Sequence, residues 1–490
     1  MGTVLKNRDL KMTEGPLLGK IVRFMLPLML TNLLQVFYNA ADMMVVELSG
    51  VENAVGAVGM TGSFVTLITN VFIGFSVGAN VLVARNLGAK NEEGVSRAVH
   101  TAVCMSLIFG VLGGAVGIAV SRPVLVAMQT GDSLLGLATT YTYFYFAGIP
   151  FISLTNYLIS IFRAKGDTRT PLIVLMLSGL ANVLFNLFFV LVCHLSVEGV
   201  ALATVIANAI SAFVLLLRLS RENGPCRFSF KKLRISKDAF FDIVGIGLPA
   251  GIQGALFSIS NMLIQSSILQ INSIEVEKLG VMASYEPVVK GNAATLSLEN
   301  FAFTAVNAVH QAAVTFTGQN AGAKRYDRVK RVVGACFLVE GCVAVLITLV
   351  LLLLHSPLLS LYGVRAVEGD PVAMLAYNTA KTRIYVKWLP FILYAVMDVC
   401  NAVLRGLGKS MTATAVSLVG TCFFRVVWIY TVFQMFFSLE ALYISYPISW
   451  GMTAAAAFIC VCVILGKRIK ETASAAAADG GEACTAKAEE

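Results

Sequence analysis

The chain has few charged residues. Only 13% of its 490 residues are Asp, Glu, Lys or Arg, whereas soluble proteins carry about 25%. Hydrophobic residues make up 57% of the sequence, and the mean hydropathy is +0.79. No polar stretch is long enough to form a separate soluble domain. This composition excludes an ordinary soluble protein and predicts a multi-pass membrane protein whose partner is the lipid bilayer.

Several catalytic and binding motifs are missing as well. The sequence has no GxxxxGK[ST] phosphate-binding loop, which excludes a nucleotide as the energy source within this chain. It has neither a nucleophile elbow nor an HExxH motif, so we expect no enzyme activity. The ten Cys form no CxxC pair and the four His show no ligand spacing. We therefore expect no disulfide framework, no metal site of these residues and no cofactor.

The sequence has long apolar runs instead. About 20 apolar residues cross a hydrocarbon core of about 30 Å, and in lipid such a run must be helical to satisfy its own backbone hydrogen bonds. The first run begins at Ile21, is too long for a signal peptide and lacks a small-residue cleavage site. We count twelve spans, at 21–47, 55–82, 97–120, 136–161, 171–193, 197–219, 240–270, 286–317, 332–355, 384–404, 410–436 and 440–466.

The basic residues are distributed unevenly between these spans. With the amino terminus in the cytoplasm, most of the 37 Lys and Arg residues fall on the cytoplasmic side, as the positive-inside rule requires. The outer side receives few, among them Lys381, Arg383 and Lys387. We expect both termini in the cytoplasm and the spans in the plasma membrane. The net charge of +9 is then an orientation signal, with no nucleic acid as partner.

One short stretch occurs twice. Asn86-Leu-Gly-Ala-Lys90 recurs as Asn320-Ala-Gly-Ala-Lys324, and Leu26-Pro27 recurs as Leu248-Pro249. The matches keep the same order in both halves, which indicates a duplicated unit of six spans. The alternative is that apolar sequences resemble one another by composition alone.

The predicted fold is an all-α polytopic membrane protein with twelve transmembrane helices in two six-helix repeat lobes. Two lobes that rock about a central site are the alternating-access design of secondary transporters. The expected segments are a cytoplasmic N-terminus (1–20), an N-terminal lobe (21–219), a cytoplasmic linker (220–239), a C-terminal lobe (240–466) and a disordered cytoplasmic tail (467–490).

Three carboxylates inside predicted spans are candidates for binding a coupling ion or the substrate, because buried charge in a membrane is costly. They are Asp42 in the first span, Glu299 in the eighth and Asp398 in the tenth. An exposed charge at the outer interface remains the alternative for Asp42, and a side chain that reaches the cytoplasmic surface for Asp398. We expect H⁺ or Na⁺ as the coupling ion, with Na⁺ near Asp42 or Glu299. The roles of Glu47 and Glu340 stay open.

Other polar or special residues lie in the same spans. Arg425 lies at a depth close to that of Glu299, so we expect it to be the ion-pair partner of that carboxylate. Pro27 and Pro249 occupy equivalent places and are candidate hinges. The amides are candidates for the ion or substrate site, with interhelical hydrogen bonding as the alternative; they are Asn39, Asn182, Asn186, Asn261 and Gln253.

Taken in order, these residues resemble the multidrug and toxic compound extrusion (MATE) family, bacterial type. The resemblance covers roughly residues 15–465. It rests on Tyr38-Asn39 with Asp42, on Gly247-Leu-Pro-Ala-Gly251-Ile-Gln253, on Gln319-Asn-Ala-Gly-Ala-Lys324, on Arg405-Gly-Leu-Gly408 and on Arg425-Val-Val-Trp428.

The resemblance implies two lobes that form a V around a central cavity, and export of organic cations in exchange for H⁺ or Na⁺. Asp42 matches the acid of the family's first span and Asn182 the Asn of its fifth. Asn186 stands where many members have Asp. That departure weakens a proton switch of two N-lobe carboxylates and favours Asp42 alone, or Glu299 and Asp398.

We therefore expect a monomeric secondary antiporter for small organic cations. The alternative is a flippase or exporter of a lipid-linked or other non-drug substrate. Such a protein would need a groove lined with basic residues, and the sequence places Arg425 alone deep inside a span.

Overall fold

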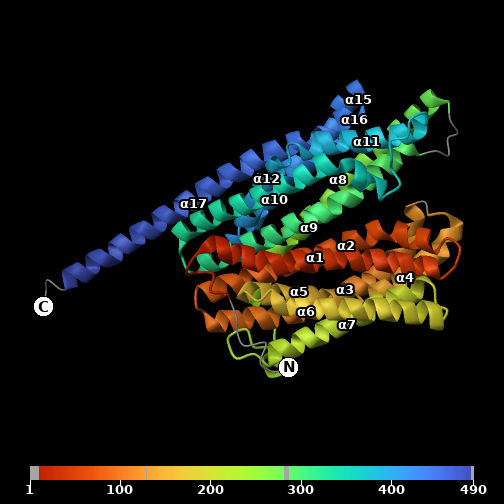
Figure 1. Ribbon diagram of the computed structural model, residues 1–490. Coiled ribbons are helices and arrows are strands. Elements are labelled where there is room, and N and C mark those ends of the chain that lie inside the picture. Colours follow the sequence, from red (N-terminus) through yellow and green to blue (C-terminus); the bar gives the residue numbers. More distant parts are fainter. Residues whose placement is uncertain (1–9, 129, 281–285, 487–490) are drawn as a thin grey trace.

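The structure is a computed structural model that describes residues 10–128, 130–280 and 286–486 (Figure 1). Of the expected N-terminal segment, residues 1–9 lie outside the described residues, as do residues 487–490 of the tail.

The first half of the chain is helical from end to end. Its helices are α1 (Leu17–Leu48), α2 (Ala54–Gly88), α3 (Glu92–Ala127), α4 (Asp132–Ala147), α5 (Ile149–Lys165), α6 (Arg169–Leu187) with the π-helical turn η1 (Phe188–Val192), and α7 (Val197–Ser220). A 3₁₀ turn, η2 (Phe230–Lys232), lies in the linker to the second half.

The second half is built in the same way. Its helices are α8 (Lys237–Leu279), α9 (Pro287–Gly322), α10 (Tyr326–Ser360), α11 (Pro371–Trp388), α12 (Ile392–Gly406), α13 (Ser410–Ser417), the π-helical η3 (Leu418–Phe423), α14 (Phe424–Tyr430), α15 (Val432–Phe436), α16 (Leu439–Tyr443) and α17 (Ser445–Ala486).

These helices correspond to the predicted spans. In the described part of the chain, nine helices are long and apolar enough to cross a membrane, and two bent pairs bring the number to eleven. The pairs are α4 with α5, bent by 49°, and α11 with α12, bent by 54°. The remaining predicted span, 286–317, is α9, which has 36 residues but carries too many polar side chains to be recognised by composition.

The tail differs from the expectation of disorder. Helix α17 begins at Ser445 and continues to Ala486, through most of the segment 467–490. The sequence there is rich in Ala, which has the highest intrinsic helix propensity, so the preceding span continues as helix.

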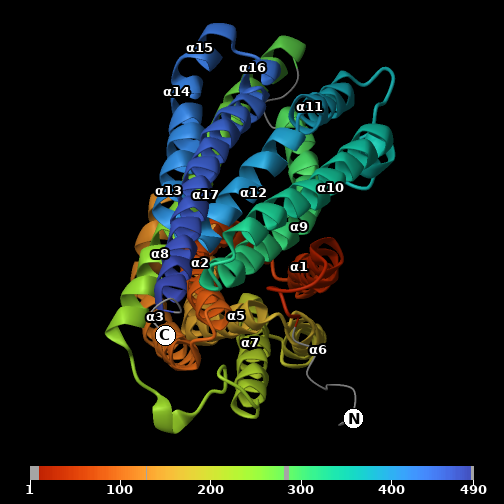
Figure 2. The ribbon, with the colours of Figure 1, turned by 90° about the vertical axis from the view of Figure 1, so that its left-hand side faces the viewer.

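The two halves form two helical lobes. Helices α1–α7 and α8–α17 make two groups that lie close at one end and diverge toward the other (Figure 1), and Figure 2 shows the same separation in a second view. Helix α2 packs along α8, and α1 and α2 pack against α9.

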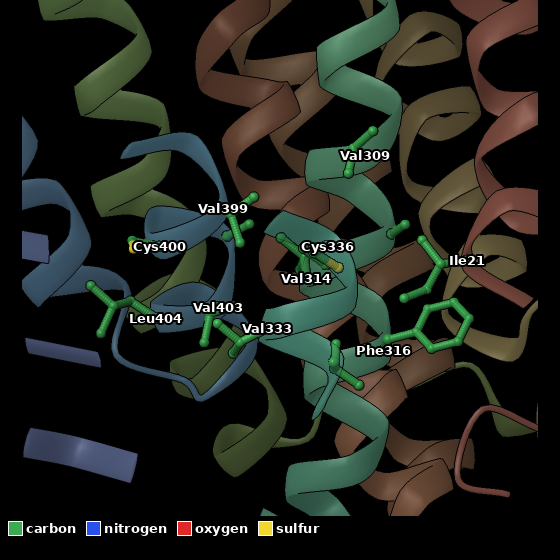
Figure 3. Packing of buried hydrophobic residues seen from close by; sticks show 14 of the residues in the cluster. Ile21, Val309, Val314, Phe316, Val333, Cys336, Val399, Cys400, Val403 and Leu404 are labelled. Atoms are coloured by element: carbon green, nitrogen blue, oxygen red, sulfur yellow. The ribbon is translucent and has the colours of Figure 1, made fainter. Parts of the chain in front are cut away.

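A large apolar core joins α1 to the second lobe. Ile21 and Phe24 of α1 pack with Phe316 of α9, and the cluster continues through Val333 and Cys336 of α10 (Figure 3). The rings of Phe24 and Phe316 meet edge to face, with centroids 5.6 Å apart. Helix α1 therefore contacts both lobes.

The repeated stretch forms one of the close contacts between the lobes. A Cβ on Gly88 would lie 1.9 Å from the carbonyl oxygen of Gln319, and a Cβ on Gly322 would lie 2.0 Å from that of Arg85. The two equivalent glycines thus face each other's helix ends, and only glycine permits this approach. Lys90 and Lys324 keep matching positive φ values of 55° and 53°.

The N-terminal segment is fixed at this same end. Met12 is fully buried, and its carbonyl oxygen accepts a hydrogen bond of 3.3 Å from Asn320 Nδ2. Arg328 Nη2 donates to the carbonyl oxygens of Glu14 and Gly15, each at 2.8 Å. The segment before α1 therefore lies over the end of the C-terminal lobe where α9 is followed by α10.

Candidate functional site

Asp42 lies in a polar cluster inside the N-terminal lobe. Asn186 Nδ2 donates a hydrogen bond of 2.5 Å to Asp42 Oδ1, and the Thr204 hydroxyl lies 3.5 Å from Oδ2. With its amide nitrogen turned toward the carboxylate, Asn182 donates to Oδ1 at 2.9 Å. Asn182 and Asn186 are four residues apart on α6 and therefore share a face. Helices α1, α6 and α7 together surround this carboxylate.

All donors to Asp42 are uncharged. Among the described residues, no Lys, Arg or His side chain forms an ion pair with it. Its amide partner Asn186 is fully buried, and the Oδ1 atom of Asn186 has no hydrogen-bond partner. In this cluster the carboxylate of Asp42 lacks a countercharge, and the amide oxygen of Asn186 lacks a hydrogen-bond donor.

Two of the predicted amides lie elsewhere. Asn39 on α1 and Asn261 on α8 are exposed, and neither belongs to the polar cluster at Asp42. Pro27 and Pro249 lie inside α1 and α8, which continue as helices through them. Glu47 is exposed near the end of α1.

Glu299 on α9 lies in a buried ionic cluster of the C-terminal lobe. Arg383 binds it with two hydrogen bonds, from Nε to Oε1 at 2.9 Å and from Nη2 to Oε2 at 2.8 Å. Lys387 Nζ donates to Oε2 at 2.6 Å. Arg383 and Lys387 stand four residues apart on α11, so both point to the same side. The fork of an arginine matches the two carboxylate oxygens, which makes this a strong pair.

The predicted pair between Glu299 and Arg425 does not form. Arg425 Nε instead donates to Ser449 Oγ at 3.1 Å, and its guanidinium lies 4.2 Å from the centre of the Tyr446 ring. The prediction is wrong because the predicted tenth span begins at 384 and the sequence assigns both Arg383 and Lys387 to the outer side. Helix α11 begins at Pro371, so Arg383 and Lys387 are inside the lobe, with exposed fractions of 1% and 3%.

Asp398 on α12 forms a second polar cluster. His310 Nδ1 lies 3.0 Å from each of its carboxylate oxygens, and Arg405 Nη1 lies 3.4 Å from His310 Nε2. Because arginine can only donate, Nε2 accepts and Nδ1 carries the hydrogen toward Asp398. Arg405 Nη2 also donates to Gln253 Oε1 at 2.9 Å. Asp398 is thus linked to His310 on α9 and, through His310 and Arg405, to Gln253 on α8.

Glu340 lies close to this second cluster. It is fully buried on α10, interacts electrostatically with Asp398, and both of its carboxylate oxygens lack a hydrogen-bond donor. Its burial explains why a single acid interrupts an apolar helix, since it faces the interior of the lobe and not lipid.

Several residues of these clusters were not found from the sequence. Thr204 carries no signal, because a hydroxyl on an apolar helix is common. His310 was set aside because it has no metal-ligand spacing. Arg383 and Lys387 did carry a signal, an i, i+4 pair of cations beside an apolar run. In the described residues, no three His, Cys, Asp or Glu side chains lie together as metal ligands.

The sequence profile of one family, MatE, matches residues 27–188 and 253–431. These two segments cover more than half of the chain, one in each lobe. The chain belongs to the MatE family. This confirms the resemblance seen in the sequence, and as a MatE protein the chain is a transporter and not an enzyme.

Relatives of this MatE protein share its length. It is 24% identical over 402 residues to the "Probable multidrug resistance protein YoeA" of Bacillus subtilis (strain 168), covering 81% of this chain and 82% of the relative. It is 22% identical over 394 residues to the "FAD transporter" of Shewanella oneidensis (strain ATCC 700550 / JCM 31522 / CIP 106686 / LMG 19005 / NCIMB 14063 / MR-1), covering 78% and 79%.

A solved structure shows the same fold. The transporter of the MOP superfamily from Pyrococcus furiosus Vc1 superposes with a TM-score of 0.84 at 18% identity, over 95% of this chain and 99% of the other. Its description reads "Reverse polarity of binding pocket suggests different function". The likeness supports the all-helical, two-lobed architecture.

Proposed function

We propose that this protein is a secondary antiporter that exports organic cations in exchange for H⁺ or Na⁺ by alternating access. The observation that carries the proposal is the carboxylate of Asp42, which is held by two amides and a hydroxyl and has no countercharge among the described residues. The relatives named for multidrug resistance support a drug as cargo. The coupling ion, the cationic substrate and the antiport step are parts of this proposal.

In the proposed mechanism, the substrate and the coupling ion compete for the negative charge of Asp42. An ionised Asp42 attracts a cationic substrate, and the same oxygens accept H⁺ or Na⁺. Binding of the ion from outside removes the negative charge, so the substrate is released there. Asn186, in place of a second carboxylate, leaves a single charge to be neutralised.

Glu299 and Asp398 differ in whether they could bind the coupling ion. Glu299 already has Arg383 and Lys387 on its oxygens, so a further cation there would meet two positive charges. We therefore assign it a structural role and do not place Na⁺ beside it. Asp398 retains a neutral partner in His310 and is the second candidate for coupling.

The geometry of the lobes fits an outward-open state. The contact between the lobes involves the ends of α2 and α9, next to the loops that the charge distribution assigns to the cytoplasm. We propose that both termini and the linker 220–239 are cytoplasmic, that the lobes are 21–219 and 240–466, and that the protein works as a monomer in a bacterial inner membrane. Pro27 and Pro249 would serve as hinges.

The test is efflux of a lipophilic cation such as ethidium from proteoliposomes, with pH and Na⁺ gradients imposed separately. Efflux driven by one gradient supports the proposal and identifies the ion. Asp42→Asn should reduce the rate by about ten-fold or more, since it removes the charge that binds both ligands. Glu47→Gln, at an exposed position of the same helix, should leave the rate unchanged. Full activity of Asp42→Asn would refute the assignment.

A second candidate function is export of an anionic substrate. The sequence argues against it, because it places Arg425 alone deep in a span. Arg383 and Lys387 are now seen to be buried in the same lobe, which removes that argument. The relative named as an FAD transporter also supports an anionic substrate. Transport of a flavin nucleotide without efflux of ethidium would favour this alternative.

A further inference from the structure

One buried cluster of the C-terminal lobe, separate from the cluster of Asp398 and Glu340, holds an excess of positive charge. Arg383, Lys387, Arg425 and Glu299 have exposed fractions of 1%, 3%, 5% and 2%. Three cationic side chains thus share one carboxylate. A buried charge without a countercharge is strongly disfavoured, above all inside a membrane protein.

The remaining polar groups around the cluster are neutral. Asn292 on α9 accepts a hydrogen bond from Arg383, and Ser449 on α17 accepts one from Arg425. Gln265 on α8 and Tyr443 on α16 are bonded to Asn292, and the ring of Tyr446 on α17 faces Arg425. None of these groups adds a negative charge. The helices that surround the cluster therefore do not supply the missing countercharge from their described residues.

Glu299 cannot neutralise the whole cluster. Its Oε1 accepts from Arg383, and its Oε2 accepts from both Arg383 and Lys387. Arg425 lies outside this pair, and no described carboxylate is within ion-pair distance of it. The uncompensated charge is thus located at Arg425.

Arg425 also has an unused donor. Its Nε donates to Ser449, but its Nη2 is buried and has no hydrogen-bond partner among the described residues. Its guanidinium lies 4.2 Å from the centre of the Tyr446 ring, and Lys387 Nζ lies 4.3 Å from the same ring. The ring of Tyr446 therefore contacts both cations, yet an aromatic ring attracts cations without cancelling their charge.

Loss of a proton from Lys387 would not compensate the charge of Arg425. Arginine stays protonated in proteins, so Arg425 would keep its charge and Nη2 would still lack an acceptor. A buried donor that also carries an unbalanced charge is costly, and an anion would supply both the acceptor and the countercharge.

We propose that the C-terminal lobe binds a small monovalent anion of the halide class at Arg425, with Nη2 as a donor. The small size follows from the burial of Arg425 and of its neighbours Tyr446 and Ser449, which leaves no room for a large ligand beside the guanidinium in this conformation. The proposal goes beyond the transport function and does not depend on which substrate is exported.

Thermal unfolding of the purified full-length protein in detergent tests the proposal. The measurement compares sodium chloride with sodium gluconate at equal ionic strength, because gluconate is too large for a buried site. A ligand that binds only the folded state raises the unfolding temperature, so chloride should raise it by about 2 °C or more and saturably. Equal unfolding temperatures in the two salts would overturn the proposal.

Single substitutions test whether the chloride-dependent shift in unfolding temperature arises at Arg425. Arg425→Gln should abolish the chloride-dependent shift, whereas Lys381→Gln, which changes an exposed lysine of α11, should preserve it. Asp42→Asn should also preserve it, which separates this site from the proposed transport site. A chloride shift that persists in Arg425→Gln would contradict the assignment.

Anomalous diffraction tests the anion site directly in the wild-type protein, so no variant has to fold. Crystals of the wild-type protein grown with bromide should give an anomalous peak within hydrogen-bond distance of the Arg425 guanidinium. Absence of a peak at this position, at a bromide concentration that saturates the thermal shift, would overturn the proposal.

Discussion

Asn186 Nδ2 lies 2.5 Å from Asp42 Oδ1, so the amide of one buried residue is in direct contact with the carboxylate of the candidate site. The two residues are 144 positions apart in the sequence. The contact gives Asp42 a neutral donor at a place where a second acid would make a carboxylate pair. In the proposed antiport, it thereby sets the number of charges that the coupling ion neutralises.

Asn186→Asp should change the ion dependence of transport. Two carboxylates in contact cannot both stay ionised without a cation, so the variant should take up one ion more than the wild type. We expect the Hill coefficient of ion-driven efflux to rise from about 1 to about 2. The same substitution at exposed Asn39 is the control and should leave the coefficient unchanged. An unaltered coefficient in Asn186→Asp would show that Asn186 does not contact the coupling ion.

Glu299→Gln should destabilise the C-terminal lobe. It leaves Arg383 and Lys387 buried without their carboxylate, and removal of one partner from a buried pair costs about 3–5 kcal/mol in the free energy of unfolding. The double variant Glu299→Gln with Lys387→Gln removes one of the two stranded charges and should recover part of the loss. Denaturation followed by tryptophan fluorescence measures both. A double variant no more stable than the single one would mean that the charge of Lys387 contributes little.

Gly74→Ala should impair the change between conformations. A Cβ at this position of α2 would lie 2.3 Å from the backbone nitrogen of Gly251 on α8, so the two lobes could not pack as they do. Overpacking of this kind costs about 1–3 kcal/mol, which shifts a two-state equilibrium by about 5–150-fold. Distances between spin labels on the two lobes, together with efflux rates, would report the shift.

Gly59→Ala is the matched control on the same helix. Its Cβ would have no neighbouring atom within 4 Å, so labels and efflux should behave as in the wild type. If Gly74→Ala gives the same label distances as Gly59→Ala, the contact of α2 with α8 does not limit the conformational change.

The sequence by itself determined the fold class, the spans and the family. These features depend on local composition, since an apolar run long enough to cross the bilayer has to be helical wherever it occurs. The repeated Asn-x-Gly-Ala-Lys stretch predicted the duplication, and Asp42 with Asn182 and Asn186 gave the core of the candidate site. The predicted start of the tenth span, at 384, is too late, because Lys381 and Arg383 interrupt the apolar pattern of α11.

Only the tertiary structure decided which charges are compensated. Glu299 and its partner Arg383 are 84 positions apart, and no local pattern indicates that α11 turns its cations toward α9. The same holds for His310, which became relevant through its contact with Asp398. The free energy of a buried charge depends on its neighbours in space and not on its neighbours in sequence. The sequence therefore identified the charged residues of the membrane core, and the packing of the helices determined that Asp42 and Arg425 lack a countercharge while Glu299 has two.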